Sequence, residues 1–456
     1  MRFLIFTLSV LICTSPLFSQ NADLPRRSLE GYWTGALIRG GNSVQIVRAE
    51  IRSSGDSLVI ESSIPDWAYY PPRISRLDTA GNELSFTTYY GDAKMILDTT
   101  YMEMVGSVQD VNPPYNFHLK KSLRPPREII VSKDLEIEND GANISGTLYY
   151  AENATKPLSC AVIVHGRGCA PRQWKESRAR VLAKYGMAAF VYDKRGSEPS
   201  GFPCDESTHD LNVSDVSKIV SKVAVEKLID KDKIGLISYS AGGWIAPHVA
   251  AESKKPIAFL ITVVGPTTSV KRQQLDGLEA FLREDGMGEE AIAQAKEYTE
   301  LMFSTQNRQG AFDQMQELLV EGEKSGWTKW LVEDDYLNSP EGFEDLWVQR
   351  FSYDPGEDLK NIKGPYLAIF GEEDNVVPYE IQIARLKELM KEAGKTNYDA
   401  KVVWAGSHGL EHGHKLREIP SDRSRSPQYY FKFDRVGYGA VEYIIEFLEK
   451  YDVVAN

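Results

Sequence analysis

A serine, an aspartate and a histidine occur in that chain order, each a few residues after a short apolar run. Ser240 follows the run 234–237, Asp374 follows 366–370, and His408 follows 401–404. A serine hydroxyl is nearly inert at neutral pH and needs a base within hydrogen-bonding reach. Histidine, with an unperturbed pKa of about 6.5, can take and return that proton, and an aspartate can orient the ring. The order therefore predicts acyl-transfer chemistry with a serine nucleophile.

The residues around Ser240 fit a nucleophile on a tight strand-to-helix turn. The positions two before and two after it must be small, because two backbones approach there, and they hold Ser238 and Gly242. The start of the following helix offers a free backbone N–H at Ala241. A second N–H, from Arg167 in the loop 165–168, would complete an oxyanion hole.

The histidine and the acid are chosen by position. His408 comes soonest after its strand and has a glycine two positions before it and one directly after it. His412 and His414 have no acidic or cysteine partners at helical spacing, so no metal site is predicted. Asp374 is preferred over its two glutamate neighbours because it is the last acidic residue on the turn after the strand.

From about residue 127 the apolar residues form short, nearly continuous runs that alternate with helix-like segments. The runs are 161–164, 188–192, 234–237, 257–264, 366–370 and 401–404, and the helix-like segments include 173–185, 214–228, 241–252 and 379–394. Strands that are apolar on both faces indicate an α/β fold with a mostly parallel, doubly wound sheet. Ligands of such sheets bind beyond the carboxyl ends of the strands, where the three candidate side chains stand.

The region before residue 127 has a different pattern. Between residues 29 and 122, apolar and polar residues alternate in short runs separated by turn signals, at a spacing that fits roughly eight strands. This predicts an all-β, antiparallel barrel or sandwich over 21–125. A basic, proline-containing stretch at 120–127 is typical of a linker between this region and the α/β part of the chain.

The first residues of the chain bear on where the protein is located, and its net charge bears on which partners it can bind. Residues 1–20 have the layout of a signal peptide, which predicts a secreted or periplasmic protein, and Ile12 before Cys13 disfavours a lipoprotein anchor. The net charge of −13 argues against nucleic acid as a partner. No apolar run in the mature chain reaches the roughly 20 residues of an integral membrane segment. Cys169 and Cys204 lie in predicted loops, and the sequence leaves open whether they form a disulfide.

Over about residues 127–456 the chain resembles the α/β-hydrolase superfamily, most closely bacterial secreted serine esterases with an N-terminal β domain. The resembling pieces are 146–148, His165-Gly166-Arg167-Gly168, Tyr192-Asp193-Lys194-Arg195-Gly196, Ser240-Ala241-Gly242-Gly243, 353–355, 371–374 with 377–378, and 407–410. The resemblance implies a Ser240, Asp374 and His408 triad and no cofactor.

Two residues depart from the family pattern. Ser238 replaces a glycine, and Arg167 stands in an oxyanion loop that is often small or apolar; its side chain points either at an acidic substrate group or at solvent. An amphipathic insertion at 266–351 is expected to be a helical cap that divides the core into 126–265 and 352–456.

Together these features predict a secreted serine hydrolase that cleaves small-molecule carboxylic esters through an acyl-enzyme. Ser240 would attack the carbonyl, and the amides of Ala241 and Arg167 would hold the oxyanion. Two alternatives stay open: a peptidase or amidase that uses the same triad, and a non-catalytic protein whose β domain binds the ligand.

Overall fold

The N-terminal strands form a closed antiparallel barrel of eight strands. The computed structural model describes residues 29–39, 43–63, 73–88, 91–100, 102–108, 115–123, 130–254, 256–404, 406–410 and 440–454. The predicted signal peptide, His412 and His414 lie outside these ranges. Each barrel strand pairs with the next, and β1 closes the ring by pairing with β8. The strands are β1 (Gly31–Arg39), β2 (Ser43–Ser54), β3 (Ser57–Ser63), β4 (Arg73–Ala80), β5 (Glu83–Thr88), β6 (Gly91–Asp98), β7 (Glu103–Val108) and β8 (Tyr115–Ser122).

The alternation in the sequence becomes the two faces of the barrel wall. On β6, Ala93, Met95 and Leu97 are buried while the residues between them are exposed. Trp33 is fully buried in the barrel core, and its indole N–H donates to the Leu29 carbonyl at 2.9 Å. The barrel interior is therefore an apolar core, as small eight-stranded barrels often have.

The second unit is built on an eight-stranded sheet in the order β18-β17-β16-β15-β13-β14-β12-β9. The strands from β14 to β18 in this order run parallel, and β12 and β9 add an antiparallel edge. Their bounds are β9 (Ile130–Leu135), β12 (Gly146–Ala151), β13 (Leu158–Val164), β14 (Ala188–Tyr192), β15 (Ile229–Tyr239), β16 (Leu260–Val263), β17 (Tyr366–Gly371) and β18 (Tyr398–Val403). A short hairpin of β10 (Glu138–Asn139) and β11 (Ala142–Asn143) lies between β9 and β12.

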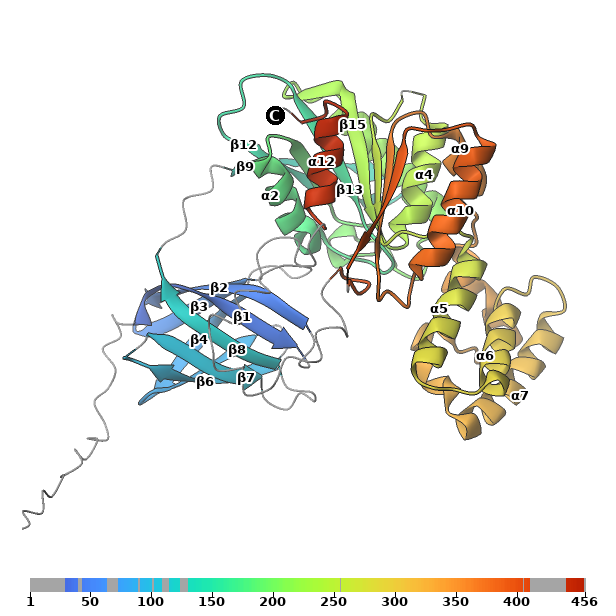
Figure 1. The fold of residues 1–456 in the computed structure, drawn as a ribbon, viewed down its shortest axis with the longest axis horizontal. Helices are drawn as coiled ribbons and strands as arrows, with labels where there is room; N and C mark the ends of the chain where they lie inside the picture. The colour runs from blue at the N-terminus through green and yellow to red at the C-terminus, as the bar shows by residue number, and fades with distance from the viewer. Residues whose placement is uncertain are drawn as a thin grey trace, which may run out of the picture.

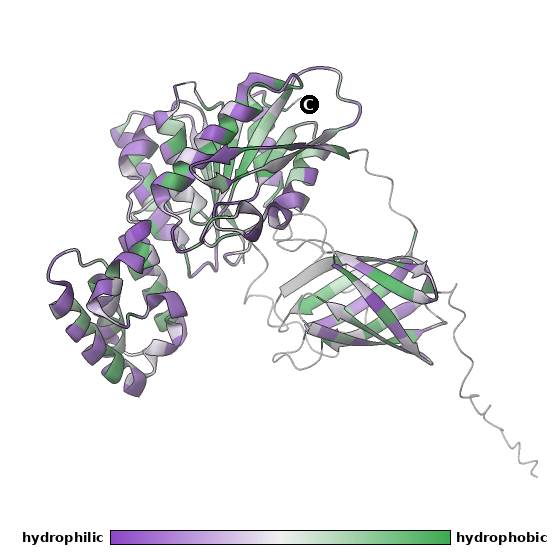
Figure 2. Ribbon diagram, turned by 180° about the vertical axis from the view of Figure 1, so that it is seen from behind, coloured by the Kyte–Doolittle hydropathy of each residue, from purple (hydrophilic) through white to green (hydrophobic). Residues whose placement is uncertain are grey.

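Helices cover both faces of this sheet, as the predicted α/β fold requires (Figure 1). One face packs on α2 (Glu176–Lys184) and α12 (Glu442–Lys450). The other packs on α3 (His209–Val223), α4 (Gly242–Glu252), α9 (Gly356–Asn361) and α10 (Tyr379–Glu392). Figure 2 shows hydrophobic residues on the strands and hydrophilic residues along the outer sides of the helices. The 3-10 turns η1 (Arg172–Lys175) and η2 (Glu198–Ser200) lie in the connections.

One predicted helix is displaced along the chain. The pattern suggested a helix at 214–228, whereas α3 spans His209–Val223. Thr208 starts it early, because its side chain accepts from the backbone N–H of Leu211 at 3.3 Å and so caps the first turn. The last five residues of the predicted helix, 224–228, form the turn that leads into β15 at Ile229.

The insertion between β16 and β17 is helical and has its own core. It consists of α5 (Val270–Glu284), α6 (Glu289–Leu301), α7 (Arg308–Ser325), η3 (Trp327–Trp330), η4 (Glu333–Asp335), η5 (Pro340–Asp345) and α8 (Trp347–Arg350). Tyr298 and Trp327 are fully buried in it, with ring centroids 5.6 Å apart. Within the described ranges, no helix combines the length and apolar character needed to cross a membrane.

Candidate active site

Ser240 occupies a strained turn between β15 and α4. Its φ of 51° lies in the left-handed region, which costs a non-glycine residue about 1–3 kcal/mol and is typical of functional sites. The turn is tight, since a Cβ on Gly242 would stand 2.7 Å from the His165 carbonyl oxygen. Ser238 is fully buried and directs its hydroxyl to the Ile261 carbonyl at 3.5 Å, so a serine fits where the family has glycine.

The structure brings together the three side chains singled out in the sequence. His408 Nε2 lies 2.9 Å from Ser240 Oγ. On the other side of the ring, His408 Nδ1 lies 2.9 Å from Asp374 Oδ2 and 3.1 Å from Oδ1. The three residues follow β15, β17 and β18, and strands β15 to β18 are parallel neighbours through β16, which explains why they meet at one edge.

Asp374 is fixed from behind by the backbone. Its side chain is fully buried, and its Oδ1 accepts hydrogen bonds from the amides of Val376 at 2.9 Å and Val377 at 3.0 Å. A carboxylate can only accept, so the facing Nδ1 of His408 must carry the proton. Nε2 is then the lone-pair nitrogen that faces the serine hydroxyl, which is the tautomer that a general base needs.

The two predicted oxyanion donors lie beside the serine. A Cβ on Gly166 would be 3.1 Å from Ser240 Cβ, so the Gly166–Arg167 peptide packs directly on the serine. Among the described residues, no backbone carbonyl accepts from the amides of Arg167 and Ala241. Both amides therefore remain available to a ligand.

Lys194, a residue not predicted from the sequence to belong to the site, holds this peptide. Its side chain is buried, and Nζ donates to the Gly166 carbonyl at 2.6 Å. In a trans peptide the C=O and the next N–H point in opposite directions, so the bond turns the Arg167 N–H away from Lys194. Burial lowers the pKa of Lys194 to about 8, although nearby Asp215 acts in the opposite direction.

The Arg167 side chain contacts the helical insertion. Its Nη2 lies 3.2 Å from Asp334 Oδ2, and its guanidinium stands 4.1 Å from the centre of the Trp347 ring. From the sequence, the Arg167 side chain is expected to point at an acidic substrate group or at solvent. Neither expectation includes Asp334, because a contact across 167 positions leaves no local signal.

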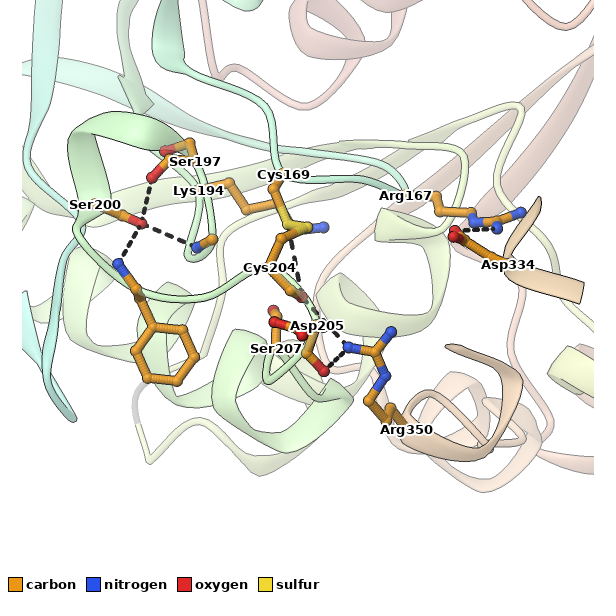
Figure 3. Close-up of a disulfide and its surroundings, with 12 residues drawn as sticks. Arg167, Cys169, Lys194, Ser197, Ser200, Cys204, Asp205, Ser207, Asp334 and Arg350 are labelled. Carbon is orange, nitrogen blue, oxygen red and sulfur yellow. Dashed lines mark hydrogen bonds and ion pairs between the residues drawn. A yellow bond between two sulfur atoms is a disulfide. The ribbon is translucent and has the colours of Figure 1, made fainter. Parts of the chain in front are cut away.

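The open disulfide question is answered by the structure: Cys169 and Cys204 are bonded, with their Cα atoms 5.9 Å apart (Figure 3). The bridge ties the loop that carries Arg167 to the segment before α3. It also borders a cavity that reaches Ala241, the residue directly after Ser240. The cavity is lined by Arg167, Gly168, Cys169, Lys194, Cys204, Ser207, Ala241, Asp334, Trp347, Arg350 and Phe351.

The other described histidines lie outside this arrangement. His165 is buried, and its Nε2 contacts the Tyr192 carbonyl at 2.8 Å, while burial holds its pKa well below the usual value. His209, the first residue of α3, and His248, on α4, stack on Tyr353. In the ranges that the structure describes, no group of three or more His, Cys, Asp or Glu side chains could hold a metal.

Residues 162–401 match the model of the alpha/beta hydrolase fold family. The match spans more than half of the 456 residues, and the chain belongs to this family.

Individual relatives are distant. The chain is 24% identical over 265 residues to a bifunctional esterase/perhydrolase of Acinetobacter calcoaceticus, which covers 57% of this chain and 88% of that protein. It is 23% identical over 280 residues to a non-heme chloroperoxidase of Streptomyces lividans, and this alignment covers 60% of this chain and 91% of that protein. A carboxymethylenebutenolidase homolog of Mus musculus is 37% identical over 67 residues, which is 15% of this chain and only 27% of that protein. A solved esterase of Pyrococcus furiosus aligns with a TM-score of 0.42 at 17% identity, covering 70% of this chain and 91% of the other.

Proposed function

We propose that the protein is a serine hydrolase that cleaves carboxylic esters through an acyl-enzyme on Ser240. The observation that carries this proposal is the 2.9 Å approach of His408 Nε2 to Ser240 Oγ, with Asp374 behind the ring. In the proposed mechanism His408 takes the hydroxyl proton as Ser240 attacks the ester carbonyl. It then gives the proton to the leaving alcohol.

The developing oxyanion would be held by the amides of Ala241 and Arg167, which have no backbone acceptor within the described part of the chain. Losing one such donor typically lowers the rate by about 10²–10³. Water then attacks the acyl-enzyme with His408 again as base, and the carboxylic acid is released. An esterase function also agrees with the name of the Acinetobacter relative, a bifunctional esterase/perhydrolase.

We further propose that the protein acts outside the cytoplasm. The signal-peptide pattern of residues 1–20 supports this, and so does the Cys169–Cys204 disulfide, because such bonds persist in oxidising compartments. The N-terminal sequence of the protein recovered from its host would test this: a start after about residue 20 is expected, and an intact residue 1 would contradict it.

The catalytic proposal is tested by hydrolysis of 4-nitrophenyl esters of increasing acyl length, beside aminoacyl 4-nitroanilides. Wild type should cleave the esters, and Ser240→Ala should lose about 10⁴-fold or more in kcat. Faster cleavage of the anilides would favour the peptidase alternative. No turnover of any substrate by the folded wild type would favour the non-catalytic binding protein.

A further inference from the structure

The cavity that borders the Cys169–Cys204 bridge has three cationic side chains in otherwise largely apolar walls. Arg167, Lys194 and Arg350 line it, against one carboxylate, Asp334. The chain as a whole carries a net charge of −13, so this concentration of positive charge runs against the overall balance. The cavity also includes Ala241, the residue directly after the nucleophile. A ligand bound here would therefore lie against the residue that directly follows the nucleophile.

Two of the three cations have no carboxylate partner among the described residues. Arg350 donates through Nη1 to the backbone carbonyls of Cys204, at 3.3 Å, and Asp205 (Figure 3). Lys194 donates to the Gly166 carbonyl. Carbonyl oxygens satisfy one donor each but do not neutralise the charge, although for Lys194 the charge of Asp215 opposes the effect of burial. A guanidinium has five N–H donors and an ammonium three, so both groups keep donors for a ligand.

Arg167 is the one cation of the cavity that is balanced, by Asp334. The next carboxylate, Asp335, accepts from the backbone amide of Val332 at 3.0 Å. Burial raises its pKa, and the nearby Arg167 and Trp347 act in the opposite direction. Counting Asp335, three cations face two carboxylates. The walls therefore keep an excess of positive charge. Trp347 and Phe351 supply apolar surface between the charged groups, which suits a short carbon chain.

We propose that this cavity binds a carboxylate of the substrate, so that the preferred ester carries a negative charge on its acyl or its alcohol part. This inference rests on the proposed esterase function and names its substrate class. Arg350 and Lys194 would be the recognising groups, because charge-assisted hydrogen bonds to a carboxylate are the strong ones in a partly closed site.

The test compares matched esters on the full-length protein. On the acyl side, 4-nitrophenyl hemiglutarate is paired with 4-nitrophenyl valerate, which has the same chain length without the charge. On the alcohol side, the acetate ester of 6-hydroxyhexanoate is paired with hexyl acetate. We expect kcat/KM to favour the anionic member of at least one pair by about tenfold or more. Which pair discriminates shows on which side the carboxylate lies.

The variant Arg350→Met should reduce that preference to about twofold or less while neutral esters are still cleaved. The matched control is Arg308→Met, which removes an arginine of the helical insertion that pairs with Glu344 outside the cavity. This variant should keep the full preference for the anionic ester. Raising the salt concentration should weaken the preference in wild type.

Equal kcat/KM within both pairs for wild type would overturn the inference and leave the esterase proposal intact. The same holds if the preference survives in a folded Arg350→Met protein. If instead wild type cleaves none of the four esters in a Ser240-dependent manner, the proposed function itself fails.

Discussion

His408 Nε2 and Ser240 Oγ lie within hydrogen-bonding distance, 2.9 Å apart, although 168 positions separate the two residues in the chain. They meet because each follows the carboxyl end of a strand in the parallel part of one sheet. The contact depends on the orientation of the imidazole, which Asp374 sets from the other side of the ring.

Asp374→Asn should therefore lower kcat by about 10⁴-fold with little change in fold. Oδ1 accepts from the amides of Val376 and Val377, so the side-chain oxygen of the asparagine would take that place and its NH₂ group would face Nδ1. The ring would then carry its proton on Nε2 and could not act as base. The matched control is Asp313→Asn, an exposed carboxylate on α7. A loss below tenfold in Asp374→Asn would contradict the assigned role.

Lys194→Met should lower kcat by about tenfold or more, less than the 10²–10³ of losing an oxyanion donor outright. The ammonium holds and polarises the peptide whose N–H is assigned to the oxyanion, and methionine keeps the length without the charge. KM should change little, measured with a neutral ester so that substrate charge plays no part. Lys222→Met, on the exposed side of α3, is the control.

The same lysine predicts a fall in activity above about pH 8, the pKa to which burial lowers it. Burial disfavours the charged form of Lys194 and Asp215 favours it, while Lys194 in turn adds to the effects of burial and Arg178 that lower the pKa of its neighbour Lys175. The unfolded chain holds this proton up to about pH 10.5, so between pH 8 and 10.5 deprotonation of Lys194 favours the folded state. The fall would thus be a loss of catalysis, and Lys194→Met should lack it. A limb near pH 8 that persists unchanged in this variant would rule out Lys194 as its source.

Gly242→Ala should destabilise the protein by about 1–3 kcal/mol and reduce turnover. The added methyl would stand 2.7 Å from the His165 carbonyl, and backbone must move to admit it. Urea unfolding and ester hydrolysis measure the two effects. Gly288→Ala, whose methyl would meet nothing within 4 Å, should leave turnover unchanged and lose only about 1 kcal/mol or less of stability, since Gly288 is the N-cap of α6. A Gly242→Ala protein as stable and active as wild type would show that the turn is looser than described.

Reduction of the Cys169–Cys204 bond should lower both Tm and kcat. The bond closes a 35-residue separation, worth about 3–4 kcal/mol in the chain-entropy account, and anchors the loop that carries Arg167. A Cys169→Ala/Cys204→Ala protein should show the same losses and no further response to reductant. If that double variant still loses Tm or kcat on addition of reductant, the bridge is not the cause of the loss.

The sequence supported the fold and the choice of candidate residues because both depend on local patterns. Apolar runs followed by Ser240, Asp374 and His408 are visible within a few positions, and parallel strands bring their ends to one edge. The closure of the barrel was less accessible. It depends on β1 pairing with β8, some eighty positions away, and a sandwich satisfies the same alternation.

Features set by distant contacts had no local signal. Lys194 stood in a recognised motif, but its bond to the Gly166 carbonyl crosses 28 positions. The hydrogen bond from Arg350 to the Cys204 carbonyl crosses 146 positions. The early start of α3 had a signal, Thr208, because threonine is a common helix cap; the apolar pattern alone placed the helix too late.

The most direct test of the central claim is covalent labelling with a fluorophosphonate, followed by mass spectrometry of the intact protein and of its peptides. One adduct per chain is expected, on the peptide that contains Ser240, and none in Ser240→Ala. A folded wild-type protein that takes up no label, or a Ser240→Ala protein that is labelled equally, would contradict the account.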